Sequence, residues 1–121
     1  MPKRIADLVG LDAVREAASG DRNTVATAVR YTLQCLSDRA PGKSVEVRVP
    51  PFGAVQAVEG PGHTRGTPPN VIETDATTWL ALATGESTWA EAFASGKVHA
   101  SGTRADVSPW LPLVRVGKTS Q

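Results

Sequence analysis

The sequence has one cysteine, no long apolar run and almost no net charge, and each shortage excludes a class of protein. Cys35 alone cannot form an internal disulfide, and one cysteine with two scattered histidines cannot build a structural zinc site. No stretch approaches the roughly 18 apolar residues of a membrane-spanning helix, so we expect no stable membrane insertion. Thirteen basic against twelve acidic residues leave a formal net charge of +1. That charge is too small to gather nucleic acid through its phosphates.

Recognisable catalytic motifs are also missing. The sequence has no G-x-S-x-G, no H-E-x-x-H and no glycine-rich phosphate loop after a strand. Asp75 and Glu91 are better explained as helix caps, and we expect Cys35, on an amphipathic helix, to be a buried and inert thiol. The N-terminus lacks the apolar region and cleavage site of a signal peptide. The sequence therefore predicts a cytoplasmic protein without catalytic residues, metal or cofactor.

The composition is that of one folded domain. The 121 residues, 40% hydrophobic and 21% charged, suffice for one core and are too few for two ordinary domains. We therefore expect residues 1–121 to form a single domain.

Helical spacing of apolar residues predicts two helices in the first third of the chain. The first covers residues 4–19, is short or broken at Gly10, and has Gly20 as its C-cap. The second begins behind the cap candidates Asp21 and Asn23 and ends at an Ala-Pro-Gly sequence.

Alternation of apolar and polar residues predicts strands over 45–49 and 54–58, which we expect to pair as an antiparallel hairpin. Further strands are predicted over 71–74 and 97–101. Between these two strands, capping residues predict helices that begin behind Asp75 and behind Thr88, and after the last strand Ser108 and Pro109 are expected as N-cap and first residue of a final helical turn. This order predicts an α+β fold, with a small antiparallel or mixed sheet and helices packed on one of its faces.

Two stretches of the C-terminal half resemble a known family. They read T-D-A-T-T-W-L-A-L-A-T-G (74–85) and W-A-E-A-F-A-S-G-K-V-H-A-S-G (89–102), and the second contains the spacing A-F-x-x-G-K-x-x-x-x-G. This pattern resembles sterol carrier protein type 2 domains, and E-V-R-V-P-P-F-G-A-V-Q-A-V-E-G resembles a bacterial stand-alone branch of that family. The resemblance covers roughly residues 24–114.

The resemblance implies an apolar tunnel between sheet and helices that binds a lipid or fatty acyl chain without catalysis. The strand region between Gly42 and Asp75 is shorter than in better-known members, which leaves little room for a fifth strand or a sterol-sized cavity. Large apolar side chains would line the pocket, although the same residues could simply fill a core. The candidates are Phe52, Trp79, Leu82, Trp89, Phe93, Trp110 and Leu111.

Two other functions remain open at this stage. One is a protein–protein interaction or accessory domain with a filled core, because a fold does not fix a function. The other is a small accessory to a thiol-dependent enzyme, because sterol carrier domains also occur fused to enzymes. The sequence identifies neither the ligand nor the oligomeric state.

A loop over residues 60–69 is expected to border the pocket. It contains six Gly or Pro residues and no apolar periodicity, and it exceeds the usual hairpin connection of 2–5 residues. His63 and Arg65 could form a pocket rim that meets a lipid carboxylate or phosphate, or they could belong to an ordinary surface loop.

The rim hypothesis can be tested with the double variant His63→Ala/Arg65→Ala. Two rim cations should contribute about 1–3 kcal/mol through charge-assisted hydrogen bonds, so titration with an anionic lipid probe should show weaker binding. Unchanged affinity would leave the loop as plain surface.

Overall fold

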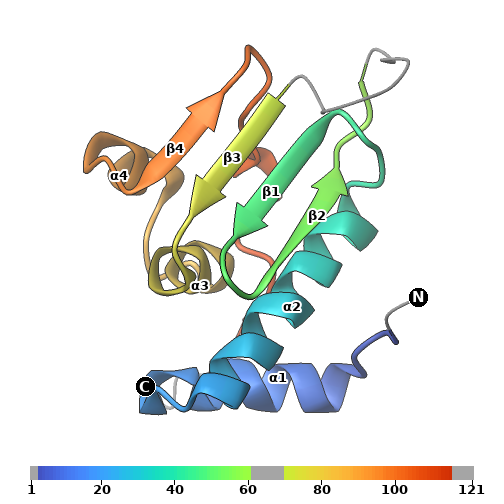
Figure 1. Cartoon of the computed structure of the whole chain (residues 1–121), viewed down its shortest axis with the longest axis vertical. Helices are drawn as coiled ribbons and strands as arrows, with labels where there is room; N and C mark the ends of the chain where they lie inside the picture. Colours follow the sequence, from blue (N-terminus) through green and yellow to red (C-terminus); the bar gives the residue numbers. More distant parts are fainter. Residues whose placement is uncertain (1–2, 61–69, 116–121) are drawn as a thin grey trace.

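The computed structural model describes residues 3–60 and 70–115, and Figure 1 shows the arrangement of the elements. In chain order the helices and strands are α1 (Asp7–Glu16), the 3-10 turn η1 (Ala17–Ser19), α2 (Arg22–Arg39), β1 (Val45–Val49), β2 (Gly53–Ala57), β3 (Asn70–Thr74), α3 (Ala76–Thr84), α4 (Trp89–Ala94), β4 (Val98–Ser101) and the 3-10 turn η2 (Ser108–Trp110).

The four strands form one mixed sheet in the order β2-β1-β3-β4. β1 pairs antiparallel with β2 and parallel with β3, and β4 pairs antiparallel with β3 (Figure 1). The predicted hairpin is confirmed, and so is the α+β class. β2 and β4 are the edges of this sheet, so each has one neighbouring strand.

The two faces of the sheet differ in polarity because side chains alternate along each strand. Val45, Val47 and Val49 of β1 are fully buried on the inner face. They belong to the same core cluster as Leu36 of α2 and Trp79 of α3. The opposite face carries charged and polar side chains, namely Glu46, Arg48, Gln56 and Glu73.

One hydrogen bond joins α2 to α3 inside the core. The indole Nε1–H of Trp79 donates to Oγ1 of Thr32 over 2.8 Å, and both residues are buried. The Thr32 hydroxyl in turn donates to the Ala28 carbonyl oxygen over 2.8 Å. The largest buried side chain of the core therefore has its only polar group satisfied by a neighbouring helix.

Of the two alternatives predicted for the first helix, a short helix is confirmed and a break at Gly10 is wrong, because α1 runs unbroken over the 10 residues from Asp7 to Glu16. Gly10 is buried, and a Cβ atom added there would overlap the ring of Tyr31 on α2. The glycine therefore allows two helices to approach closely, at some cost in helix propensity. The helix also begins later than predicted, since Lys3–Ala6 lies outside it.

The predicted capping residues at three helices are confirmed. Asp21 accepts a hydrogen bond from the Thr24 backbone, which lowers the pKa of the Asp21 carboxyl, and Asp75 caps α3. Thr88 and Glu91 form the predicted capping box at α4. Gly20 ends the α1–η1 segment and Gly85 ends α3, each in the left-handed conformation. The final helical turn was predicted with Ser108 as its N-cap and Pro109 as its first residue, but it begins one residue earlier, at Ser108, with Val107 as the N-cap.

Replacing Thr32 with valine tests the importance of the buried hydrogen bond. Thr32→Val keeps the side-chain shape but leaves the Trp79 N–H without an acceptor, so we expect a loss of about 1–3 kcal/mol in the free energy of unfolding. Urea unfolding followed by tryptophan fluorescence measures this loss. The matched control is Thr84→Val on α3, because the Thr84 hydroxyl donates only to carbonyls of its own helix. Equal effects of the two substitutions would contradict the assignment.

Candidate functional site

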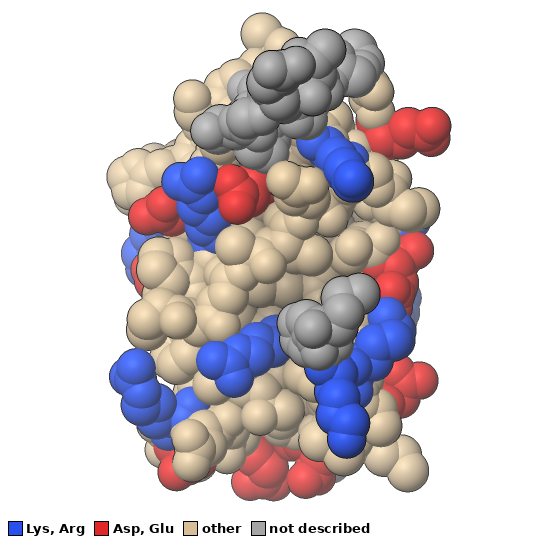
Figure 2. All heavy atoms as spheres, turned by 45° about the vertical axis from the view of Figure 1, so that its right-hand side comes forward, with Lys and Arg blue, Asp and Glu red and all other residues tan. Residues whose placement is uncertain are grey.

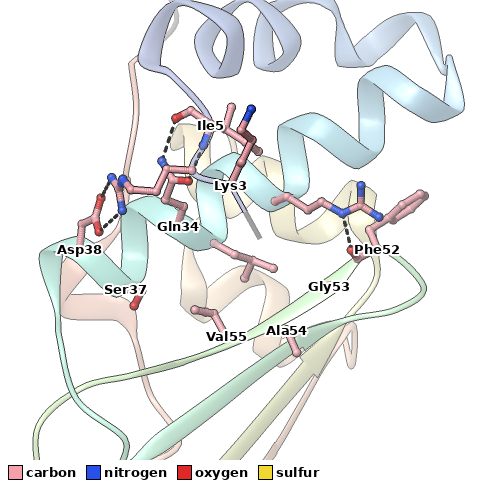
Figure 3. A pocket seen from close by; sticks show the side chains of 12 residues that line it. Lys3, Ile5, Gln34, Ser37, Asp38, Phe52, Gly53, Ala54 and Val55 are labelled. Atoms are coloured by element: carbon pink, nitrogen blue, oxygen red, sulfur yellow. Dashed lines mark hydrogen bonds and ion pairs between the residues drawn. The ribbon is translucent and has the colours of Figure 1, made fainter. Parts of the chain in front are cut away.

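A groove of about 430 Å³ lies between α2 and the edge strand β2. Its volume falls in the range of about 300–1,000 Å³ that is typical of small-molecule sites. Three segments form the walls, as the close view in Figure 3 shows. They are the N-terminal residues 3–5, the side of α2 between Arg30 and Asp38, and residues 52–55 at the start of β2.

The apolar part of the groove follows from the position of β2 in the sheet. Val55 lies opposite Val47 and points to the same inner face, but β2 is an edge strand, and among residues 3–60 and 70–115 no further strand pairs with its open side. Val55 therefore stays only partly buried, beside Leu33 of α2. Ile5 and Phe52 add apolar surface at the two ends. The outcome is an apolar surface that opens between the helical layer and the sheet.

Positive charges surround this apolar surface. Lys3, Arg4 and Arg30 all line the groove. The Arg30 Nε–H donates to the Phe52 carbonyl oxygen over 2.9 Å, and the guanidinium of Arg22 lies 5.3 Å from the centre of the Phe52 ring. Figure 2, which turns the β2 side forward, shows uncharged atoms across the middle of this face and several Lys and Arg side chains below them.

Only one of these lining cations is neutralised within the described chain. Arg4 forms a two-pronged ion pair with Asp38, with distances of 3.0 and 2.7 Å, and this contact lowers the pKa of the Asp38 carboxyl. Among residues 3–60 and 70–115, no acidic side chain pairs with Lys3 or Arg30. In the part of the chain that the structure describes, the groove therefore has two cations without an acidic partner.

A second hollow of about 570 Å³ adjoins the first on the α1 side. It shares Lys3, Arg4, Ile5 and Arg30 with the groove. Its other lining residues are Ala6, Val9 and Thr27.

The structure does not gather the seven predicted pocket residues into one site. Phe52 alone among them lines the groove. Trp79 and Leu82 are each 1% exposed and belong to the core, while Trp110 and Leu111 pack against it half-buried. Trp89 stacks on Phe93 of α4 with ring centroids 6.2 Å apart, and Phe93 is 54% exposed. The roles of these residues in binding stay predictions.

The predicted rim residues His63 and Arg65 lie outside the described residues. Sequence reasoning did not find Arg30, Leu33, Gln34 and Val55, which form much of the groove. Their pattern was readable, since Arg30, Leu33 and Gln34 share one side of α2 at helical spacing. The missing information was the strand order, which makes β2 an edge and leaves Val55 uncovered.

The described residues provide little for catalysis. No group of three His, Cys, Asp or Glu residues in residues 3–60 and 70–115 could hold a metal ion. Cys35 is half-buried on α2, and its burial raises the pKa of the thiol. At neutral pH the thiol is therefore protonated and a poor nucleophile. Within the same ranges no helix has the length and apolar character to cross a membrane.

The low reactivity of Cys35 is directly measurable. Because burial raises its pKa, alkylation by iodoacetamide at neutral pH should be slower than that of a free cysteine, and the rate should rise with pH beyond the ordinary thiol range. Mass spectrometry of the intact protein follows the reaction, and unfolded protein in urea is the control. Alkylation of the folded protein as fast as that of the unfolded control would mark Cys35 as a reactive thiol.

Comparison with known proteins identifies the family. No curated protein matches the chain. A family model described as bacterial SCP ortholog matches residues 21–113. The matched span begins at the N-cap of α2 and includes β2, so it contains two of the three groove walls and leaves out the N-terminal residues 3–5. Since this span covers well over half of the 121 residues, the chain belongs to the bacterial SCP ortholog family, which is sterol carrier protein-like.

Proposed function

We propose that this protein binds one amphipathic lipid without catalysis, with the acyl chain in the groove between α2 and β2. Family membership points to lipid binding in general. The observation that carries the specific proposal is an apolar groove of ligand size with two unneutralised cations on its walls. An acyl chain with an acidic head group matches both features.

The acyl chain contributes most of the binding free energy in this proposal. Each methylene removed from water contributes about 0.8 kcal/mol. Leu33 and Val55 form the middle of the apolar surface, and Phe52 and Ile5 extend it. Figure 3 shows Val55 on the strand and Ile5 on the N-terminal segment on opposite sides of the groove.

The acidic head group would lie beside Arg30, at the Phe52 end of the groove, so that the acyl chain runs toward Ile5. Arg30 uses its Nε–H for the Phe52 carbonyl oxygen, which fixes the orientation of the guanidinium. The terminal nitrogens of a guanidinium held in this way can donate to a carboxylate or phosphate with short, charge-assisted hydrogen bonds. Arg4 is less suited to this role because Asp38 already occupies its guanidinium.

We place the ligand in the groove rather than among the predicted pocket aromatics. Trp79 and Leu82 already contact core residues on all sides, and each is 1% exposed. Entry of a chain there would require the Trp79–Thr32 hydrogen bond to break. The groove needs no such rearrangement, since Ile5, Phe52 and Val55 on its walls are partly exposed, although Leu33 is buried.

The non-catalytic part of the proposal rests on the groove chemistry. Its single carboxylate, Asp38, is paired with Arg4, and the lining residues include no histidine or cysteine. General acid–base catalysis requires a base whose pKa lies near the working pH, whereas the hydrogen bond from Arg4 lowers the pKa of Asp38 and makes it a weaker base.

A second candidate function is an interaction domain, which the exposed aromatic pair on α4 favours. Phe93 is 54% exposed and stacks on Trp89, and α4 precedes the edge strand β4. Exposed aromatic side chains beside an edge strand are typical of interaction surfaces. This surface is separate from the groove, so the two functions do not exclude each other.

The lipid proposal predicts that filling the groove removes binding. Val55→Trp puts an indole into the apolar surface, and we expect the affinity for a fluorescent fatty acid to fall at least about tenfold, or about 1.4 kcal/mol. The control is Gln56→Trp, one residue further along β2, because side chains alternate and Gln56 points to the outer face. Fluorescence titration of the two variants and the original protein gives the comparison.

The outcomes of this experiment separate the candidates. Loss of binding in Val55→Trp but not in Gln56→Trp supports the groove. Saturable binding that neither substitution changes places the ligand elsewhere and overturns the proposed site. A protein that binds no lipid probe at all favours the interaction function instead.

A further inference from the structure

The N-terminal segment Lys3–Ile5 forms a wall that two adjoining hollows have in common. The groove of about 430 Å³ continues from this segment toward β2, and the hollow of about 570 Å³ continues toward Val9 of α1 and Thr27 of α2. Both hollows are lined by Lys3, Arg4, Ile5 and Arg30. The segment therefore lies across what would otherwise be a longer depression along α2.

Two side chains of α2 hold this segment in place. The Gln34 carboxamide accepts a hydrogen bond from the Ile5 N–H and donates one to the Ile5 carbonyl oxygen, each over 2.9 Å. One turn further along, Asp38 accepts both hydrogen bonds of the Arg4 guanidinium. Figure 3 shows these contacts on one side of the groove opening.

These contacts are of a kind that opens easily. The side chains of Arg4 and Asp38 are 68% and 51% exposed, so water and salt weaken their ion pair. The two backbone groups of Ile5 that Gln34 binds could form hydrogen bonds with water instead, so their loss costs little. Ile5 is only partly buried against the core. A segment held by so few contacts opens locally more readily than the helices behind it.

We propose that the segment Lys3–Ile5 forms a strap that limits the length of the binding groove, and that its release joins the two hollows into one longer site. This inference rests on the proposed lipid-binding function and adds its regulation. With the strap closed, the bound acyl chain occupies only the β2 side of the site. With the strap released, the acyl chain extends along α2 to Val9 of α1, which is 57% exposed.

The strap makes a specific demand on chain length. Affinity should rise about fourfold for each added methylene while the chain still finds apolar surface. In the original protein the affinity should stop rising at the ligand chain length that reaches the strap. Once the strap is released, the affinity should go on rising for longer ligand chains.

The experiment measures affinity for primary alcohols from about eight to about eighteen carbons, by displacement of a fluorescent probe. Alcohols carry no charge, so a change in local charge does not by itself alter their binding. The strap is released by Gln34→Met, which keeps the side-chain length, combined with Asp38→Asn. The control is Glu46→Gln, which removes an acid from an arginine ion pair on the outer face of the sheet.

We expect the original protein and Glu46→Gln to share one limiting chain length, and the double variant to gain at least about tenfold in affinity for chains beyond it. The same limit in all three proteins overturns the strap while leaving the proposed lipid site in place. Absence of alcohol binding in the original protein, together with absence of fatty-acid binding, overturns both proposals.

Hydrogen exchange of the Ile5 amide tests the strap without a ligand and without a variant. Raising the salt concentration to about 0.5 M screens the exposed Arg4–Asp38 ion pair, so exchange at Ile5 should become faster while exchange at Val29, in the middle of α2, does not change. Protection of Ile5 equal to that of Val29 would show that the segment opens only with the whole fold, and would overturn the proposal.

Discussion

The fold depends on α2, because this helix has a different task on each of its sides. The Thr32 hydroxyl oxygen accepts a hydrogen bond from the indole N–H of Trp79, which fixes α3 against α2 inside the core. Tyr31 packs on Gly10, where the absence of a side chain allows α1 to lie close. Leu33 and Gln34 face the groove. A change of rotation or register in α2 would disturb the core, the α1 contact and the candidate site together.

The groove is a consequence of sheet topology as much as of side-chain chemistry. β3 pairs with β1 and leaves β2 at the edge. A fifth strand beside β2 would cover Val55 and close the groove. Just before this edge strand begins, the Arg30 Nε–H donates to the Phe52 carbonyl oxygen and so ties α2 to the start of β2.

The proposed strap fits the extent of the family match. The matched residues 21–113 contain α2 and β2 but not Lys3–Ile5. The match therefore includes Leu33, Phe52 and Val55 of the groove, whereas the proposed strap lies outside it. Separating the two in this way lets groove length change without any change in the core, because the strap is held by side chains at the surface of α2.

The local signals in the sequence determined the elements and their ends. Period-2 alternation gave β1, helical spacing gave α2, and Asp21, Asp75 and Thr88 capped the helices where predicted. These features depend on residues within a few positions of one another, so they are readable without tertiary structure. The resemblance in residues 74–102 indicated the family, which the match over residues 21–113 confirmed.

Only the tertiary structure decided what Gly10 does and where the groove lies. A glycine in a helical pattern looks like a break until the Tyr31 ring is placed 21 positions later in the chain against it. Likewise, Val55 was predicted as a strand residue, but its exposure depends on which strand lies at the edge. Trp79 was predicted to line a pocket because it is large and aromatic, but it is buried in the core. Sequence patterns report local conformation, whereas cavities and close helix contacts arise between segments that are distant in the chain.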